Sequence, residues 1–163
     1  MVEGVNLSNT DCTTAAHPGC TTHELEFGFP NLRFYLEERA KMISKYDIVI
    51  INAGTNDLDP DDQVATKSVE SVLRMAELAQ AFGARTIVST IIHDVFNKDL
   101  QELAPDAVVI CDFLEEDLDT SFLDDDGVHL NDMGIAEYSK ALEECLHEVL
   151  SSKLSSSTDE EEF

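Results

Sequence analysis

Residues 47–53 form an apolar run that leads directly into Gly54-Thr55-Asn56-Asp57. An apolar run that does not alternate with polar residues is typical of a strand buried on both faces of a parallel sheet. Comparable runs occur at residues 85–92 and 107–111. Because a chain can bury such strands only when helices cover the sheet, these runs already favour an α/β fold.

Helical spacing of apolar residues occurs around these strands, over residues 31–43, 64–82 and 132–151. The last segment places Ile135, Tyr138, Leu142, Cys145 and Val149 on one stripe. Asn31 is a predicted N-cap, and Gly83 is a predicted C-terminal cap. Strands that alternate with helices predict a three-layer α/β/α sandwich around a parallel sheet.

The charge balance argues against a nucleic-acid partner. The chain has 34 acidic and 10 basic residues, for a net charge of −24. Such a surface repels phosphate backbones, so we expect no nucleic-acid partner, although it would favour cationic partners or simply maintain solubility. We also expect no membrane association and a cytoplasmic location, because the sequence has no membrane-spanning run and no secretory signal at its start. The sequence does not determine the oligomeric state.

We interpret residues 1–151 as one domain and residues 152–163 as a disordered acidic tail, because the composition of the tail cannot bury apolar surface. The four cysteines are too scattered for a disulfide framework. We predict that Cys111 and Cys145 are small buried residues, the first in a strand and the second on a helix stripe.

The segment Gly54-Thr55-Asn56-Asp57 follows its strand directly. In an open parallel sheet, active sites lie outside the carboxyl ends of the strands. The amide of Asn56 could therefore donate a hydrogen bond to an oxyanion that develops during acyl transfer. The alternative is a strand-to-helix turn in which Gly, Asn and Asp serve the backbone alone.

A second polar segment is Asp126-Gly127-Val128-His129. A carboxylate three residues before an imidazole can fold back through a glycine turn and orient the ring, as the acid of a catalytic triad does. Taken alone, an acidic residue before a histidine in a loop usually belongs to the surface. The Leu130-Asn131-x-x-Gly134 sequence that follows, before an amphipathic helix, makes the pattern more specific.

With these segments the chain resembles the SGNH (GDSL-type) hydrolase family from about Val5 to Leu150. A third matching segment is His17-Pro18-Gly19-Cys20-Thr21-Thr22. The resemblance implies a flavodoxin-like α/β/α fold and acyl-ester hydrolysis of a small-molecule ester, without a cofactor. It makes His129 the base, Asp126 the acid that orients it, and Asn56 and the Gly19 N–H the oxyanion donors.

The nucleophile segment of the family, Gly-Asp-Ser at the end of a first strand, is absent from this sequence. Ser8 is the only upstream candidate, but it stands too close to Gly19 for a parallel crossover to fit between them. We therefore interpret residues 5–16 as the family's second strand and expect the first strand to be absent or remodelled. Residues 1–5, an unseen upstream segment or a partner chain could fill the gap. The region 92–107 also looks shortened.

Two further patterns each allow a simpler interpretation. His17, Cys20 and His23 could ligate a metal, but a polar Pro-Gly loop explains them as well, and we expect no metal. Acidic residues crowd the approach to Asp126, and they either form a solvated loop or rim the site and raise the pKa of His129. They are Glu115, Glu116, Asp117, Asp119, Asp124 and Asp125.

The sequence thus leaves two main functions open, besides a metal-binding module built on His17, Cys20 and His23. The first is an SGNH-type ester hydrolase-like domain that works through a Ser-His-Asp arrangement, with its nucleophile not identifiable in this chain. The second is a catalytically inactive relative that binds an acyl or glycan ligand or a protein partner. Because the chain lacks the nucleophile segment, the sequence alone does not decide whether it is an enzyme.

Overall fold

The computed structural model describes residues 11–42, 45–57, 62–113, 120–127 and 129–155. Within them, the three apolar runs form three parallel strands in the order β1 (Ile48–Ile51), β2 (Arg85–Ser89) and β3 (Val108–Cys111). The register places Ile50 opposite Ile87, and Ile87 opposite Val109. The chain is therefore an α/β protein with a parallel sheet, as predicted.

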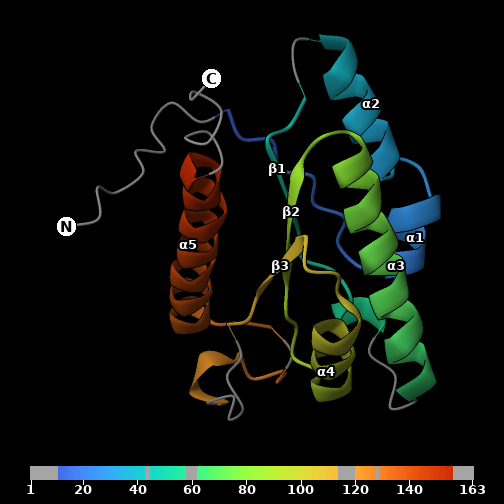
Figure 1. Ribbon diagram of the computed structural model, residues 1–163. Helices are drawn as coiled ribbons and strands as arrows, with labels where there is room; N and C mark the ends of the chain where they lie inside the picture. Colours follow the sequence, from blue (N-terminus) through green and yellow to red (C-terminus); the bar gives the residue numbers. More distant parts are fainter. Residues whose placement is uncertain (1–10, 43–44, 58–61, 114–119, 128, 156–163) are drawn as a thin grey trace.

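Helices lie on both sides of the sheet (Figure 1). Helices α1 (Thr22–Phe27), α2 (Leu32–Met42), α3 (Asp62–Ala81) and α4 (Asp94–Leu103) lie on one side. Helix α5 (Asp132–Ser155) lies on the other. Short 3-10 turns, η2 (Thr55–Asp57) and η3 (Thr120–Phe122), connect strands to helices near the carboxyl ends of β1 and β3.

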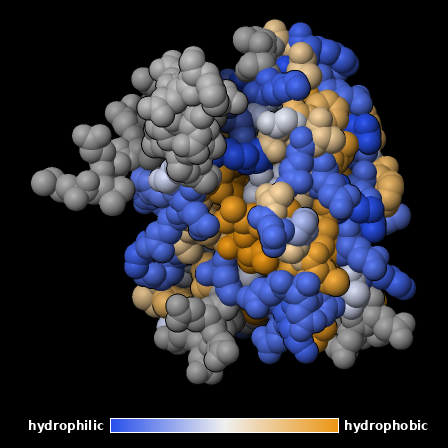
Figure 2. All heavy atoms as spheres, in the orientation of Figure 1, coloured by the Kyte–Doolittle hydropathy of each residue, from blue (hydrophilic) through white to orange (hydrophobic). Residues whose placement is uncertain are grey.

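The alternation of side chains along the strands divides the core in two. Val88 points toward α3 and α4, where it packs with Val72 and Phe96. Ile87 points toward α5, where it packs with Cys111 and Val149. Figure 2 shows apolar side chains gathered between α5 and α3 in a largely hydrophilic surface.

Two predicted helix caps are confirmed. Asn31 accepts a hydrogen bond from the Phe34 N–H at 3.0 Å, as an N-cap does. At the end of α3 the Gly83 N–H donates to the Gln80 carbonyl and the Ala84 N–H to the Ala79 carbonyl. This pair of bonds is the Schellman motif, which satisfies the last carbonyls of the helix.

Two predictions of burial are wrong. Ile50 was expected to be covered on β1, but it is 40% exposed. The reason is that α5 packs over β2 and β3 and leaves this part of β1 uncovered. Ile135 was expected on the buried stripe of α5, but it is 52% exposed. Cys111 is fully buried as predicted, whereas Cys145 is only half-buried.

The strand predicted over residues 5–16 is not present in its described part, because residues 11–16 have no regular structure. Residues 5–10 lie outside the described residues, as does Ser8.

The sequence analysis missed two helices. Helix α1 begins at a capping box, in which the Thr21 hydroxyl accepts from the Glu24 N–H and the Glu24 carboxylate accepts from the Thr21 N–H. This Thr-x-x-Glu pattern was a signal in the sequence. Helix α4 lies within the region 92–107, which looked shortened, and buries Phe96 and Leu100 one turn apart.

Helix α5 continues to Ser155, four residues beyond the boundary of 151 predicted for the folded domain. Residues 156–163, the rest of the predicted acidic tail, lie outside the described residues. Among the helices that the structure describes, none combines the length and the apolar composition needed to cross a membrane.

Candidate active site

Asp126 and His129 form a hydrogen-bonded pair in the loop before α5. The Asp126 carboxylate is 2.6 Å from Nδ1 of His129, and its other oxygen accepts the His129 backbone N–H at 2.9 Å. Because the carboxylate accepts a hydrogen bond from Nδ1–H, the neutral ring is left with a free electron pair on Nε2. The pair therefore has the arrangement of a base and the acid that orients it.

The electrostatics of this pair favour the charged imidazolium. The hydrogen bond with Asp126 raises the pKa of His129, and the charges of Asp126 and Asp124 act in the same direction. Both side chains are open to solvent, with 74% of His129 and 50% of Asp126 exposed. Of the acidic residues predicted to act on His129, Asp124 contributes to the raised pKa, whereas residues 114–119 lie outside the described residues.

Backbone hydrogen bonds within the loop that carries the pair hold its two sides together. The Asp124 N–H donates to the His129 carbonyl at 2.8 Å, and the Gly127 N–H donates to the Asp124 carbonyl at 2.9 Å. Leu123 and Leu130 form an isolated antiparallel bridge at the base of the loop. The loop is thus a small hairpin with Asp126 and His129 near its tip.

Asn131 fastens this hairpin to α5. Its side-chain oxygen caps the helix by accepting the N–H groups of Met133 and Gly134. Its amide nitrogen donates to the carbonyls of Ser121 and Leu123, at 2.7 and 2.9 Å. The sequence signalled Asn131 as part of a pattern but did not reveal this anchoring role.

The second named residue of the Asn131-x-x-Gly134 pattern, Gly134, is a glycine for a steric reason. A Cβ at this position would lie 2.3 Å from the Phe122 carbonyl oxygen. No other residue type fits there unless η3 or the start of α5 moves, so Gly134 lets the helix begin directly against the segment that precedes the hairpin.

The structure also joins Asn56 and the segment that contains Gly19. Asn56 donates a hydrogen bond from Nδ2 to the Cys20 carbonyl at 3.1 Å. Gly19 has a φ of +77° in the Pro18-Gly19 turn, which the Cys20 N–H closes by donating to the His17 carbonyl. An amide NH₂ carries two hydrogens, so the second one of Asn56 can still donate to a ligand.

Asp57 holds this junction in place. One carboxylate oxygen accepts the Thr22 N–H at 2.8 Å, and the other accepts the Thr22 hydroxyl at 3.2 Å. Thr22 is buried, with only 2% exposed. The last residue of the Gly54–Asp57 motif therefore ties η2 to the first turn of α1, a role that the sequence analysis did not assign.

The predicted residues thus form two bonded groups, Asp126 with His129 and Asn56 with the Gly19 turn. Asn56 comes after β1 and the Asp126–His129 pair comes after β3, and Figure 1 shows η2 and the start of α5 along the same edge of the sheet. A further hydrogen bond joins the end of β1 to α5: Asn52 donates to the Tyr138 hydroxyl at 3.0 Å.

The possible metal ligands are not brought together. His17 lies 3.2 Å from the Tyr35 hydroxyl, and His23 packs its ring on Phe27. Over the described ranges of the chain, no three His, Cys, Asp or Glu side chains are placed to hold a metal ion. Within the same ranges, no Ser, Thr or Cys side chain is hydrogen-bonded to Nε2 of His129.

An open depression of about 390 Å³ lies beside the hairpin. Its lining combines polar groups with two exposed apolar side chains of α5, Met133 and Ile135. The remaining lining residues are Asp124, Leu130, Asn131 and Asp132. Ile135, which was predicted to be buried, thus lines this depression instead.

Comparison with known proteins gives a match in structure alone. No protein-family model matches the chain. No curated protein sequence matches it either. Among solved structures, the chain is similar to a carbohydrate esterase of family 3 from Talaromyces cellulolyticus, with a TM-score of 0.61 and 20% identity. The match covers 83% of this chain and 70% of the esterase. At this identity the likeness shows that the two chains share a fold, and it assigns no activity to this chain.

We predict that Asn131→Ala destabilises the domain by about 2 kcal/mol, because it removes a helix cap and leaves two carbonyls without their donor. Urea unfolding followed by circular dichroism measures this change. Asn131→Ser is the matched control: its hydroxyl can still cap the helix but is too short to donate to both carbonyls, so this variant should cost about half as much. Equal losses in the two variants would contradict a role for the cap.

We predict that His129 titrates above the ordinary histidine value of 6.5. NMR titration of the His129 ring measures the midpoint, and Asp126→Asn should lower it. Because the folded pKa is raised, the charged ring stabilises the fold fully below the unfolded pKa, and this contribution is lost as the pH rises through the folded pKa. An unchanged midpoint in Asp126→Asn would contradict the pairing.

Proposed function

We propose that the chain is an SGNH-type ester hydrolase-like domain with a three-layer α/β/α architecture whose first strand is absent or remodelled. The observation that carries the proposal is the 2.6 Å contact between Asp126 and Nδ1 of His129, at the carboxyl edge of a parallel sheet. The similarity in fold to a carbohydrate esterase supports it. The hydrogen bond between Asn56 and the Cys20 carbonyl also supports it, because this bond holds the two proposed oxyanion donors, Asn56 and the Gly19 N–H, in one junction.

In this proposal His129 acts first as a general base. Nε2 takes the proton of a serine hydroxyl as its oxygen attacks the ester carbonyl, while Asp126 holds the ring through Nδ1 and stabilises the imidazolium. The negative oxygen that forms accepts hydrogen bonds from Asn56 Nδ2 and from the Gly19 N–H. Loss of one such donor typically costs about 3–4 kcal/mol in transition-state stabilisation. His129 then gives its proton to the leaving alcohol.

The Gly19 N–H is free for this task in the described structure. It donates to no other described residue, whereas the neighbouring Cys20 N–H closes the turn. The turn is fixed relative to Asn56 by the Cys20 carbonyl, and η2 is fixed relative to α1 by Asp57. The two donors are therefore held by bonds that do not involve a substrate, which is the preorganisation that oxyanion stabilisation needs.

We propose that the depression beside the hairpin holds part of the ester. Met133 and Ile135 offer apolar contact to an alkyl group, and Asn131 and Asp132 border it with polar groups. The sequence contains no Gly-Asp-Ser segment, so the position of the proposed serine has to be identified by experiment. The exposure of His129 is consistent with a site that lacks one wall in the described residues.

The test is labelling of the purified chain with a fluorophosphonate, followed by peptide mapping. We expect a serine to be labelled. The rate of this labelling should fall by about a thousandfold or more in His129→Ala, because the hydroxyl needs its base. Hydrolysis of a nitrophenyl acetate should fall in parallel.

Lys140→Ala is the matched control, since Lys140 is exposed on α5 and lies away from the pair. A well-folded chain that neither labels nor hydrolyses the ester would contradict the enzyme proposal. Labelling that persists unchanged in His129→Ala would contradict the role of His129.

A second candidate is a binding domain without catalysis, and exposed aromatic rings favour it. Phe27 is 62% exposed and Phe29 is 82% exposed. The Phe29 ring packs on Phe34, Phe34 on Tyr35, and Tyr35 on His17, so that a row of rings leads from Phe29 to the Gly19 turn. Flat apolar ring faces of this kind can stack on the C–H faces of sugars. We propose a neutral glycan as the ligand, because the acidic surface does not repel it.

Affinity electrophoresis in gels that contain soluble xylan or hydroxyethylcellulose tests this candidate. We expect retardation of the chain by at least one of these polysaccharides and about tenfold weaker binding in Phe29→Ala. Leu103→Ala removes a comparably exposed apolar side chain from α4 and should leave binding unchanged. No retardation by either polysaccharide, or an equal loss in both variants, would contradict glycan stacking.

A further inference from the structure

The end of β3 places a thiol against α5. Alternation along the strand turns Val108 and Ile110 toward α3 and α4, and Val109 and Cys111 toward α5. Cys111 is fully buried there and packs with Ile87 and Val149. The side chain is held in this orientation because β3 pairs with β2 along its whole length, with Cys111 opposite Ser89.

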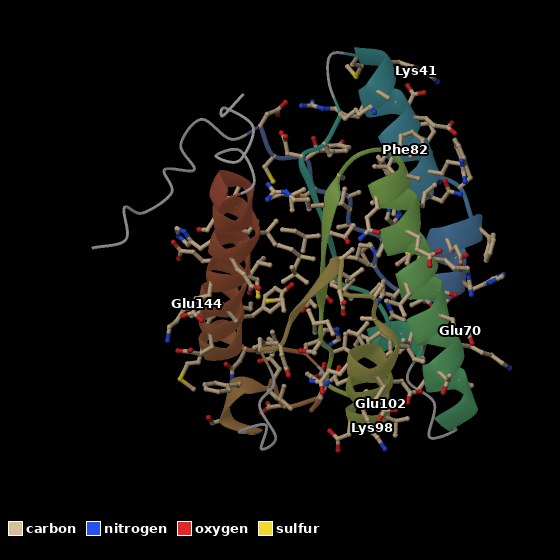
Figure 3. The ribbon with its side chains drawn as sticks, in the orientation of Figure 1. Lys41, Glu70, Phe82, Lys98, Glu102 and Glu144 are labelled. Carbon is tan, nitrogen blue, oxygen red and sulfur yellow. The ribbon has the colours of Figure 1, made fainter. Side chains whose placement is uncertain are left out.

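Helix α5 presents a second thiol to the same cluster. Leu142, Cys145 and Val149 lie at helical spacing on the face of α5 that packs on the sheet. Figure 3 shows the preceding residue, Glu144, on the outer side of the helix, which fixes the direction of this face. Cys145 packs against the cluster that contains the buried Cys111. The two cysteines therefore belong to the same packed cluster, at the contact between β3 and α5.

The two thiols differ in their access to solvent. Burial, and then the hydrogen bond with Cys145, raises the pKa of Cys111 to about 12, so that Cys111 stays protonated at neutral pH. Cys145 is only half-buried and can be reached from outside. A reagent in solution would thus meet Cys145 first, with Cys111 placed directly behind it.

We propose that Cys111 and Cys145 are a site of oxidative modification, where a low-molecular-weight disulfide such as oxidised glutathione converts the two thiols into an intramolecular disulfide bond. The bond would join β3 to α5, the helix that directly follows the Asp126–His129 hairpin. This inference does not depend on the proposed function.

The exchange balances in two steps. The Cys145 thiolate attacks one sulfur of oxidised glutathione, the S–S bond breaks, and one glutathione thiolate leaves and takes up a proton. The Cys111 thiolate then attacks the Cys145 sulfur of the mixed disulfide and releases the second glutathione. Two protein thiols are oxidised and one glutathione disulfide is reduced to two thiols. Because Cys111 must lose its proton, the second step should be slow at neutral pH and faster as the pH rises.

The experiment uses the full chain with Cys12→Ser and Cys20→Ser, which leaves Cys111 and Cys145 as its only cysteines. The folded protein is incubated with oxidised glutathione, remaining thiols are alkylated, and the digest is mapped by mass spectrometry. We expect a product about 2 Da lighter than the reduced chain, with one cross-linked peptide that contains Cys111 and Cys145. The bridged protein should melt several degrees higher, and dithiothreitol should reverse the shift.

Three results would overturn the proposal. One is a glutathione adduct that stays on Cys145 without bridge formation, and another is no reaction until urea unfolds the chain. The third is a bridged product that melts at a lower temperature, which would show that the bond does not fit the native packing. The matched variant that also carries Cys145→Ala should give neither adduct nor bridge on Cys111 in the folded state.

Discussion

The burial of β2 on both faces is the constraint on which the rest of the structure depends. Ile87 belongs to the core beneath α5, and Val88 belongs to the core beneath α3 and α4, so that adjacent residues of one strand connect both halves of the domain. Its neighbours β1 and β3 pair with it in parallel, which brings all carboxyl ends to one edge. The groups that can do chemistry lie at this edge because loops there are free to carry polar side chains.

At this edge the structure relies on hydrogen bonds rather than on burial. Asp57 joins η2 to α1, Asn56 joins η2 to the Gly19 turn, and Asn131 joins the hairpin to α5. The His129–Asp126 pair itself is largely open to solvent. A catalytic site normally excludes water, which strengthens its electrostatic interactions. The described residues thus hold the proposed base and the proposed oxyanion donors in place through hydrogen bonds, and the proposed site also needs a nucleophile.

Much of the fold could be predicted because its signals are local. The apolar run at residues 85–92 identified β2, and the spacing of Val69, Val72 and Ala76 identified α3, since these patterns reflect which face a strand or helix buries. Helix α1 was not predicted because it has only six residues, although its capping box is visible in the sequence. Ile50 was misjudged because an apolar run does not reveal whether a helix covers a particular strand.

The sequence by itself determined the parallel α/β fold, the order of the strands along the chain and the pairing of Asp126 with His129. These rest on spacings of a few residues, within reach of one turn or one strand. Only the tertiary structure decided that Asn56 bonds to Cys20, that Asp57 bonds to Thr22 and that Cys111 and Cys145 share one packed cluster. Each of these contacts joins residues from separate elements, and their meeting depends on how helices and strands pack, which no local pattern specifies.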